Sequence, residues 1–161
     1  MLDMLTLLLK DSAPSQPELS SITELFQLPM KDLDDAKNFE KLLRVQNNKS
    51  KTRTFFIGIR GTTNTIVGRV IKSIMTYECG SCFCYVGLNE DTVTVAFKTS
   101  TICDIVHDGV CEMHKSMTRD AVESNIKNWL RHCPRYALKN NEDRKINGEE
   151  EHRQDDSDYN C

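Results

Sequence analysis

The stretch FFIGIRGTTNTIVGRVIKSIM, residues 55–75, holds the clearest helical pattern of the chain. Its apolar residues recur at i, i+1, i+4, i+5, i+8 and i+9, the spacing of one buried helix face. They are Ile66, Val67, Val70, Ile71, Ile74 and Met75. Gly61 is expected to close the helix before this one, and Thr62 or Thr63 to cap its start. The glycines do not form a phosphate-binding P-loop, because Gly68 follows Gly61 at the wrong spacing and precedes arginine.

A helix is also predicted earlier in the chain, before residues 55–75. Asp34 or Asp35 offers an N-cap for AKNFEKLLRVQ, residues 36–46. The polar stretch NNKSKTR, residues 47–53, is typical of a loop. Beyond it, Phe55, Phe56 and Ile59 continue a helical face as far as the glycine.

Two helices are predicted in the C-terminal half. Ser100 is expected to cap a helix whose apolar face carries Ile102, Cys103, Val106 and Val110, with Gly109 weakening its end. Thr118 is expected to cap RDAVESNIKNWLRHC, residues 119–133, which Pro134 should end. Trp129 lies at helical spacing from Ile126 and Leu130, which predicts a core position.

The segment between these two halves has a different pattern. CFCYVGL and TVTVAF, within residues 82–97, are rich in β-branched and aromatic residues and are separated by Asn-Glu-Asp. Taken alone, this pattern predicts a short β-hairpin between the third and fourth helices. The fold class expected is therefore mainly α, a small domain of about five helices.

Charge is distributed unevenly along the 161 residues, whose formal net charge is −3. Residues 1–40 have a net charge of −5, residues 41–140 of +7 and residues 141–161 of −5. A locally basic surface attracts polyanions through counterion release even on an acidic chain. The alternative to a functional basic face is a domain that has a few surplus lysines on its surface.

Three regions are predicted along the chain. Residues 1–27 form an N-terminal segment in which Leu2, Leu5, Leu8 and Leu9 have amphipathic helical spacing, followed by a linker. Residues 28–138 form the helical domain. Residues 139–161 read as an acidic, disordered tail with almost nothing to bury.

The order of several anchor residues resembles the family called domain of unknown function 4806. The anchors are Leu28-Pro29, Phe39-Glu40, Ile59 with Gly61, the 70–74 helix ending in Thr76, Tyr85-x-Gly87, Phe97 and IKNWLRHC. The resemblance covers residue 28 to about residue 137, and implies a mostly helical module with a loop, and two short strands at most, over residues 79–97. Arg60 and Tyr85 depart from the family pattern, which has glycine and tryptophan there. The order of elements is also loosely similar to BEN domains, small helical DNA binders, an analogy at the level of fold.

Seven cysteines suggest either metal binding or free thiols. Cys79, Cys82, Cys103 and His107 have residue types that bind zinc, and Cys111 with His114 forms a second candidate pair. The twenty residues between the two pairs are not a typical zinc-finger spacing, so free cysteines and no cofactor are the prediction, with structural zinc as the alternative. A thioredoxin-like site is disfavoured, because the expected helix precedes Cys79 and Cys82 instead of following them. With no secretory signal or membrane span, we expect an intracellular protein, nuclear rather than cytoplasmic.

The candidate nucleic-acid contacts are basic residues near helix ends or on outer helix faces. They are Arg60, Arg69, Lys72, Lys98, Lys127, Arg131 and Arg135. Each has an ordinary alternative: Lys127 can pair with Glu123, and Arg131 can complement a helix dipole. His132 is expected to be a solvated cap or a phosphate neighbour.

No nucleophile and base occur in a pattern typical of catalysis, and no small-molecule substrate is expected. The sequence thus predicts a non-enzymatic binding module that docks on double-stranded DNA through phosphates. The alternative left open is a protein-interaction or homodimerisation module.

Overall fold

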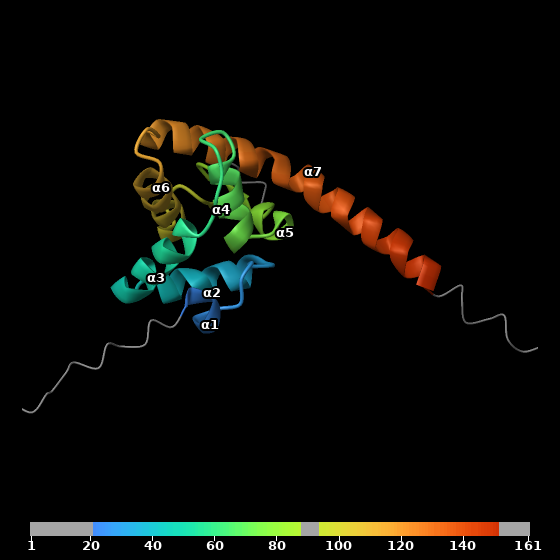
Figure 1. The fold of residues 1–161 in the computed structure, drawn as a ribbon. Helices are drawn as coiled ribbons and strands as arrows, with labels where there is room; N and C mark the ends of the chain where they lie inside the picture. Colours follow the sequence, from blue (N-terminus) through green and yellow to red (C-terminus); the bar gives the residue numbers. More distant parts are fainter. Residues whose placement is uncertain (1–20, 88–93, 152–161) are drawn as a thin grey trace, which may run out of the picture.

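The computed structural model describes residues 21–87 and 94–151, and these fold as a mainly helical domain (Figure 1). In chain order the elements are α1 (Ile22–Leu25), α2 (Leu33–Leu43), α3 (Gln46–Ile57), α4 (Ile66–Ile74), α5 (Tyr77–Gly80), β1 (Phe83–Cys84), β2 (Val95–Ala96), α6 (Thr101–Met113) and α7 (Arg119–Glu151). The predicted fold class is confirmed. Within the described ranges there are seven helices, not five, because α1 and α5 are additional single turns. The leucine-bearing segment of residues 1–20 lies outside the described residues.

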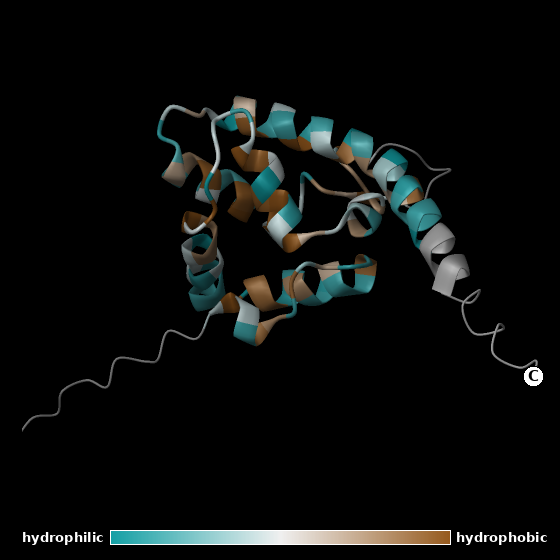
Figure 2. Cartoon of the chain, turned by 45° about the vertical axis from the view of Figure 1, so that its right-hand side comes forward, coloured by the Kyte–Doolittle hydropathy of each residue, from teal (hydrophilic) through white to brown (hydrophobic). Residues whose placement is uncertain are grey.

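Helix α4 is the centre of the core, as its periodicity predicts. All five of its apolar residues are buried, and the helix packs against both α6 and α7. Figure 2 shows hydrophobic colour on the inward sides of the helices and hydrophilic colour on their outer sides. The start of α4 differs from the prediction, since Thr65 and not Thr62 or Thr63 is the N-cap residue. Thr62 instead forms the preceding turn, accepting hydrogen bonds from the backbone N–H groups of Thr65 and Ile66.

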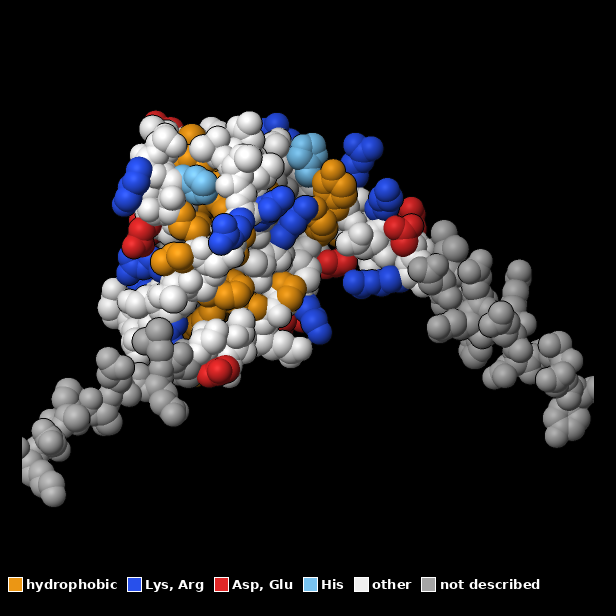
Figure 3. All heavy atoms as spheres, in the orientation of Figure 1, with side chains coloured by type: hydrophobic (Ala, Val, Ile, Leu, Met, Phe, Trp, Pro, Cys, Tyr) orange, Lys and Arg blue, Asp and Glu red, His pale blue; other side chains and the backbone are white. Residues whose placement is uncertain are grey.

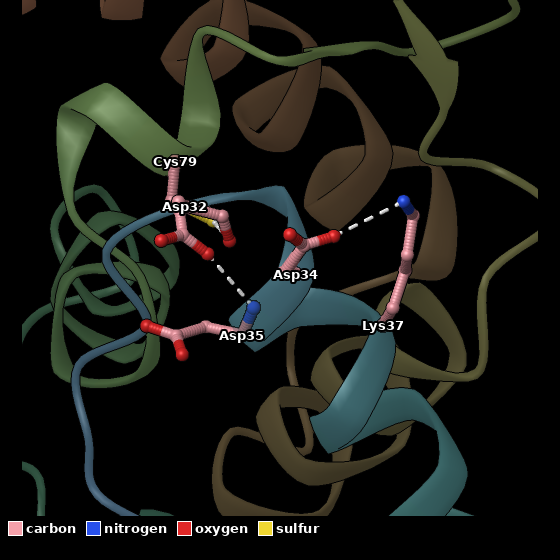
Figure 4. A network of polar contacts seen from close by, with 5 residues as sticks. All are labelled: Asp32, Asp34, Asp35, Lys37 and Cys79. Atoms are coloured by element: carbon pink, nitrogen blue, oxygen red, sulfur yellow. Dashed lines mark hydrogen bonds and ion pairs between the residues drawn. The ribbon is translucent and has the colours of Figure 1, made fainter.

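The start of α2 is also earlier than predicted, and it is anchored to α5 (Figure 4). Asp32, and not Asp34 or Asp35, is the N-cap, and its Oδ1 accepts a hydrogen bond of 2.9 Å from the backbone N–H of Asp35. The Asp35 carboxylate in turn accepts a hydrogen bond of 2.9 Å from the backbone N–H of Lys31, the residue before the cap, so side chains satisfy two backbone donors at the start of α2. The Cys79 thiol donates to the Asp32 carbonyl at 3.1 Å and so ties this cap to α5.

The polar stretch of residues 47–53 is helical, so its prediction as a loop was wrong. It lies within α3, where Thr52 and Phe56 are fully buried one turn apart. Thr52 satisfies its hydroxyl by donating to the Asn48 carbonyl at 2.8 Å. Asn48 in turn donates to the Leu42 carbonyl at 2.9 Å. Burial of one face by α6 therefore overrides the weak helix propensity of these residues.

The predicted hairpin is incorrect, because β1 and β2 are parallel. Phe83 pairs with Val95 and Cys84 with Ala96, and the ladder continues from the N–H of Phe97 to the carbonyl of Cys84 at 2.8 Å. Burial fixes this arrangement, since the rings of Phe83 and Phe97 pack edge to face at 5.5 Å. The segment remains mostly loop, as the family resemblance implies, although residues 88–93 lie outside the described residues.

Helix α7 does not end at Pro134, contrary to the prediction. The Thr118 cap is confirmed, with its hydroxyl accepting from the Ala121 N–H at 3.2 Å, but the helix runs on to Glu151. Proline removes the hydrogen bond to the Leu130 carbonyl, and packing beyond it offsets this loss, because Tyr136 stacks on Tyr77 and Ala137 is buried. The helix therefore crosses the predicted boundary between residues 138 and 139, and its end projects from the domain (Figure 1).

Candidate nucleic-acid interface

Three of the predicted basic residues lie together on the outer side of α4 and the turn before it. Arg69 and Lys72 are exposed on α4, opposite its buried apolar face, and Arg60 is exposed beside them. The Arg69 guanidinium donates through Nη1 to the Arg60 carbonyl at 2.7 Å, which fixes the two residues side by side. We call Arg60, Arg69 and Lys72 the basic strip.

The basic strip has no acidic partner among the described residues. The ion pairs in these ranges involve other cations, namely Lys37, Lys127, Arg119 and Arg144. Figure 3 shows basic and histidine side chains over the middle of the face in view, where Figure 1 places α4, with acidic side chains mostly toward its edges. Unpaired cations on one face are the electrostatic arrangement that attracts phosphates.

A groove of about 360 Å³ lies between the outer side of α4 and α7. Its α4 wall includes Gly68, Arg69 and Lys72, and its α7 wall includes Asn125, Asn128, Trp129, His132 and Tyr136. None of the described lining residues is acidic. We call this hollow the α4–α7 groove; it combines cations, amides and aromatic rings in one place.

The aromatic side of the groove is a stack of three rings. The Tyr77 ring stacks on Trp129 with centroids 5.6 Å apart and on Tyr136 with centroids 4.9 Å apart. Trp129 and Tyr136 are two turns apart on α7, so about 10 Å separates them along the axis and Tyr77 fits between them. The Lys72 ammonium lies 5.3 Å from the Tyr77 centroid, a cation–π contact that joins the basic strip to the rings.

Two predicted contacts, Lys98 and Lys127, lie elsewhere. Lys127 is bound to Glu123 at 2.6 Å, and its ammonium lies 4.9 Å from the Tyr85 centroid. The hydrogen bond from Lys127 is the main cause that lowers the pKa of Glu123, and the charge of Lys98 contributes to the same shift. The ordinary alternative for Lys127, pairing with Glu123, is thus what the structure shows.

The remaining two candidates, Arg131 and Arg135, are exposed on the outer side of α7. They are one turn apart, and each directly precedes a groove residue, His132 or Tyr136. This position places them next to the α4–α7 groove but not in its lining. The seven candidates therefore divide into the basic strip, a flanking arginine pair and a separate pair of lysines beside Glu123.

The zinc alternative lacks a ligand cluster. Within residues 21–87 and 94–151, no group of three or more His, Cys, Asp or Glu side chains is arranged to hold a metal ion. Burial is the main cause that raises the pKa of the Cys79 thiol to about 12 and that of Cys103 to about 11. These thiols are therefore protonated at neutral pH, and Cys79 acts as a hydrogen-bond donor.

His107 is one of the buried residues of α6. It is buried, and its Nδ1 has no hydrogen-bond partner among the described residues. Burial lowers its pKa below 6.5, and the charge of Arg119 lowers it further, while Glu123, Asp104 and Asp108 oppose the shift. His107 is therefore neutral at pH 7, and it is not among the residues that line the groove.

Sequence reasoning missed Tyr77, Tyr136, Asn125 and Asn128 as groove residues. The last three share one face of α7 with Trp129 and His132, at spacings of three, four or seven residues. The spacing of Asn125 and Asn128 lies within the predicted helix of residues 119–133 and was visible in the sequence, whereas Tyr136 joins this face only if the helix continues past Pro134. Nothing local to α5 pointed to Tyr77.

Comparisons with known proteins give no relative for this chain. No family model matches it, and no match was found among curated proteins or among solved structures. The similarity to domain of unknown function 4806 stays a prediction from the residues quoted above. Across the part of the chain that the structure describes, no helix combines the length and the apolar character needed to cross a membrane.

Proposed function

We propose that this protein is a non-enzymatic module that binds DNA through the phosphates. The observation that carries the proposal is the basic strip, three exposed cations without a carboxylate partner in the described ranges. The three cations lie together on one face, and this local arrangement is more informative about polyanion binding than the net charge of −3. Arginine adds a planar, bidentate fork that matches phosphate geometry.

The contacts supplied by the strip define a salt dependence. Arg60, Arg69 and Lys72 can neutralise three phosphates, and Arg131 with Arg135 raises the number to five. Each neutralised phosphate contributes about −0.9 to the slope of log K against log salt concentration. Affinity should therefore fall by about forty- to five-hundredfold between 50 and 200 mM salt.

Fluorescence anisotropy of the full chain with a labelled DNA duplex tests this proposal. We expect binding at 50 mM salt that weakens by the stated factor at 200 mM. Absence of binding at 50 mM salt would refute the DNA-binding role. Affinity that barely responds to salt would show that the strip is not the contact surface.

A protein-interaction role has one supporting observation of its own. A mostly apolar hollow of about 230 Å³ lies between α2, the two strands and the start of α6, lined in part by Phe83, Val95 and Ile102. Val95 is exposed beside it, on a strand with one hydrogen-bonded neighbour. A partner peptide or a second copy of the chain seated there would bind with little salt dependence. Sedimentation velocity across protein concentrations would reveal the second-copy case.

A further inference from the structure

We propose that the α4–α7 groove holds one unpaired nucleotide, with its phosphate at Arg69 and Lys72 and its base against Tyr136. This inference rests on the proposed DNA binding, and it names the form of DNA that the site selects. The groove volume of about 360 Å³ is at the small end of the range for ligand pockets, which suits a single nucleotide and not a duplex.

The ring stack supplies the surface for the base. Tyr136 is 45% exposed although one face of its ring is covered by Tyr77, so the remaining face is open at the mouth of the groove. The ring of His132 lies near the same residue, with centroids 6.4 Å apart and an interplanar angle of 61°. Exposed aromatic faces beside cations are how proteins bind single strands, because every base has a π-face that stacks.

The cations and the amides supply the polar contacts. Lys72 and Arg69 border the rings, and the Lys72 ammonium already lies over Tyr77, within reach of a phosphate at the groove mouth. Asn128 is exposed on the opposite wall, where its amide can donate to and accept from a base edge. This distribution places positive charge and base-pairing groups on two sides of one cavity without any acid between them.

Trp129 places a buried polar atom without a partner next to the groove. Its side chain is 9% exposed, and its Nε1 is buried without a hydrogen-bond acceptor among the described residues. Buried indole N–H groups usually have a partner, and leaving one unpaired is costly. Its neighbouring atom Cδ1 lies toward Gly68 in the groove wall, 3.9 Å from the position of an added Cβ.

A duplex presents no free base face to Tyr136, because its bases are stacked and paired. Duplex DNA therefore makes only the phosphate contacts with the basic strip and the flanking arginines, whereas an unpaired strand adds a stacking contact. Stacking on one aromatic residue is expected to strengthen binding by about 5- to 150-fold. The protein should prefer single-stranded DNA by that factor at equal length and salt.

The test uses the full chain with a twelve-nucleotide thymidine single strand and a blunt duplex of equal length, at 50 mM salt. Trp129 is the one tryptophan of the sequence, so its fluorescence reports on the groove directly. We expect tighter binding of the single strand together with a change in tryptophan emission. Equal affinity for both forms with unchanged emission overturns this inference and leaves the DNA-binding proposal standing. Failure of both DNA forms to bind overturns both.

A variant pair separates the base contact from the phosphate contacts. Tyr136→Ala removes the exposed ring and should abolish the preference for the single strand while retaining binding to the duplex. Leu138→Ala is the matched control, because Leu138 is also exposed on α7 and lies outside the groove. A preference for the single strand that persists in Tyr136→Ala would contradict the proposed base contact.

Discussion

Replacing Gly80 with alanine should loosen the packing of α5 on α7, and the structure allows the cost to be bounded. Gly80 is the last residue of α5 and is buried. A Cβ at this position would lie 2.6 Å from Cζ3 of Trp129 and 2.7 Å from Sγ of Cys133. Carbon atoms do not approach this closely, and both neighbours are held in the core, so α5 or α7 must shift.

Two opposing effects set the magnitude. Alanine in place of glycine in a helix contributes up to about 1 kcal/mol to stability. Overpacking of a filled core costs about 1–3 kcal/mol. We expect the second effect to win, with a net loss of about 1–2 kcal/mol in the free energy of unfolding and a fall of about 4–8 °C in Tm.

Urea denaturation followed by circular dichroism measures this difference. Gly68→Ala is the matched control, because its Cβ would approach only Cδ1 of Trp129, at the ordinary distance of 3.9 Å. That variant should gain about 0.4–1 kcal/mol. Cys133→Ala removes the sulfur atom that the added methyl group would meet. It should therefore lower the free energy of unfolding less in the Gly80→Ala background than in the wild type. A Gly80→Ala protein as stable as the wild type would refute this description of the α5–α7 contact.

Three further perturbations test other parts of the structure. Glu40→Ala should lower the free energy of unfolding in urea by about 1–2 kcal/mol, because the Glu40 carboxylate accepts hydrogen bonds from the N–H groups of Thr101 and Ile102 at the start of α6. Glu112→Ala, at an exposed site, is the control and should change this free energy little. The free energy of unfolding should fall as pH decreases below 6.5, because burial lowers the pKa of His107 in the folded state and the unfolded state therefore binds the proton more readily. His107→Leu should reduce the dependence of Tm on pH in this range. An unchanged dependence of Tm on pH would exclude His107 as its cause. Iodoacetamide at pH 8 should spare Cys79 and Cys133, whose thiol pKa burial raises to about 12, until urea exposes them; modification of both in the native state would contradict their burial.

Local signals predicted part of this fold well. The apolar spacing of α4 and the caps at Ser100 and Thr118 were correct, because each depends on residues a few positions apart. The errors arose where distant packing decides. Residues 47–53 are helical because Thr52 and Phe56 are buried against α6, and α7 passes Pro134 because Tyr136 and Ala137 have partners on the domain.

The candidate site was predicted only in part for the same reason. The sequence identifies basic residues on each helix, but it does not show how far each helix is rotated about its axis in the folded domain. That rotation separates Arg69 and Lys72 from Lys127, which faces Glu123 and Tyr85. The α4–α7 groove depends on two helices whose residues are more than fifty positions apart, and on Tyr77 from a third.

The central claim is that the basic strip forms the contact with nucleic-acid phosphates, and the slope of log K against log salt concentration tests it most directly. Arg69→Gln/Lys72→Gln and Lys98→Gln/Lys127→Gln each remove two positive charges, the first from the strip and the second from the site beside Glu123. We predict that the first pair reduces the magnitude of the slope for DNA by about 2, while the second leaves it unchanged. Equal slopes for the two double variants would contradict the claim.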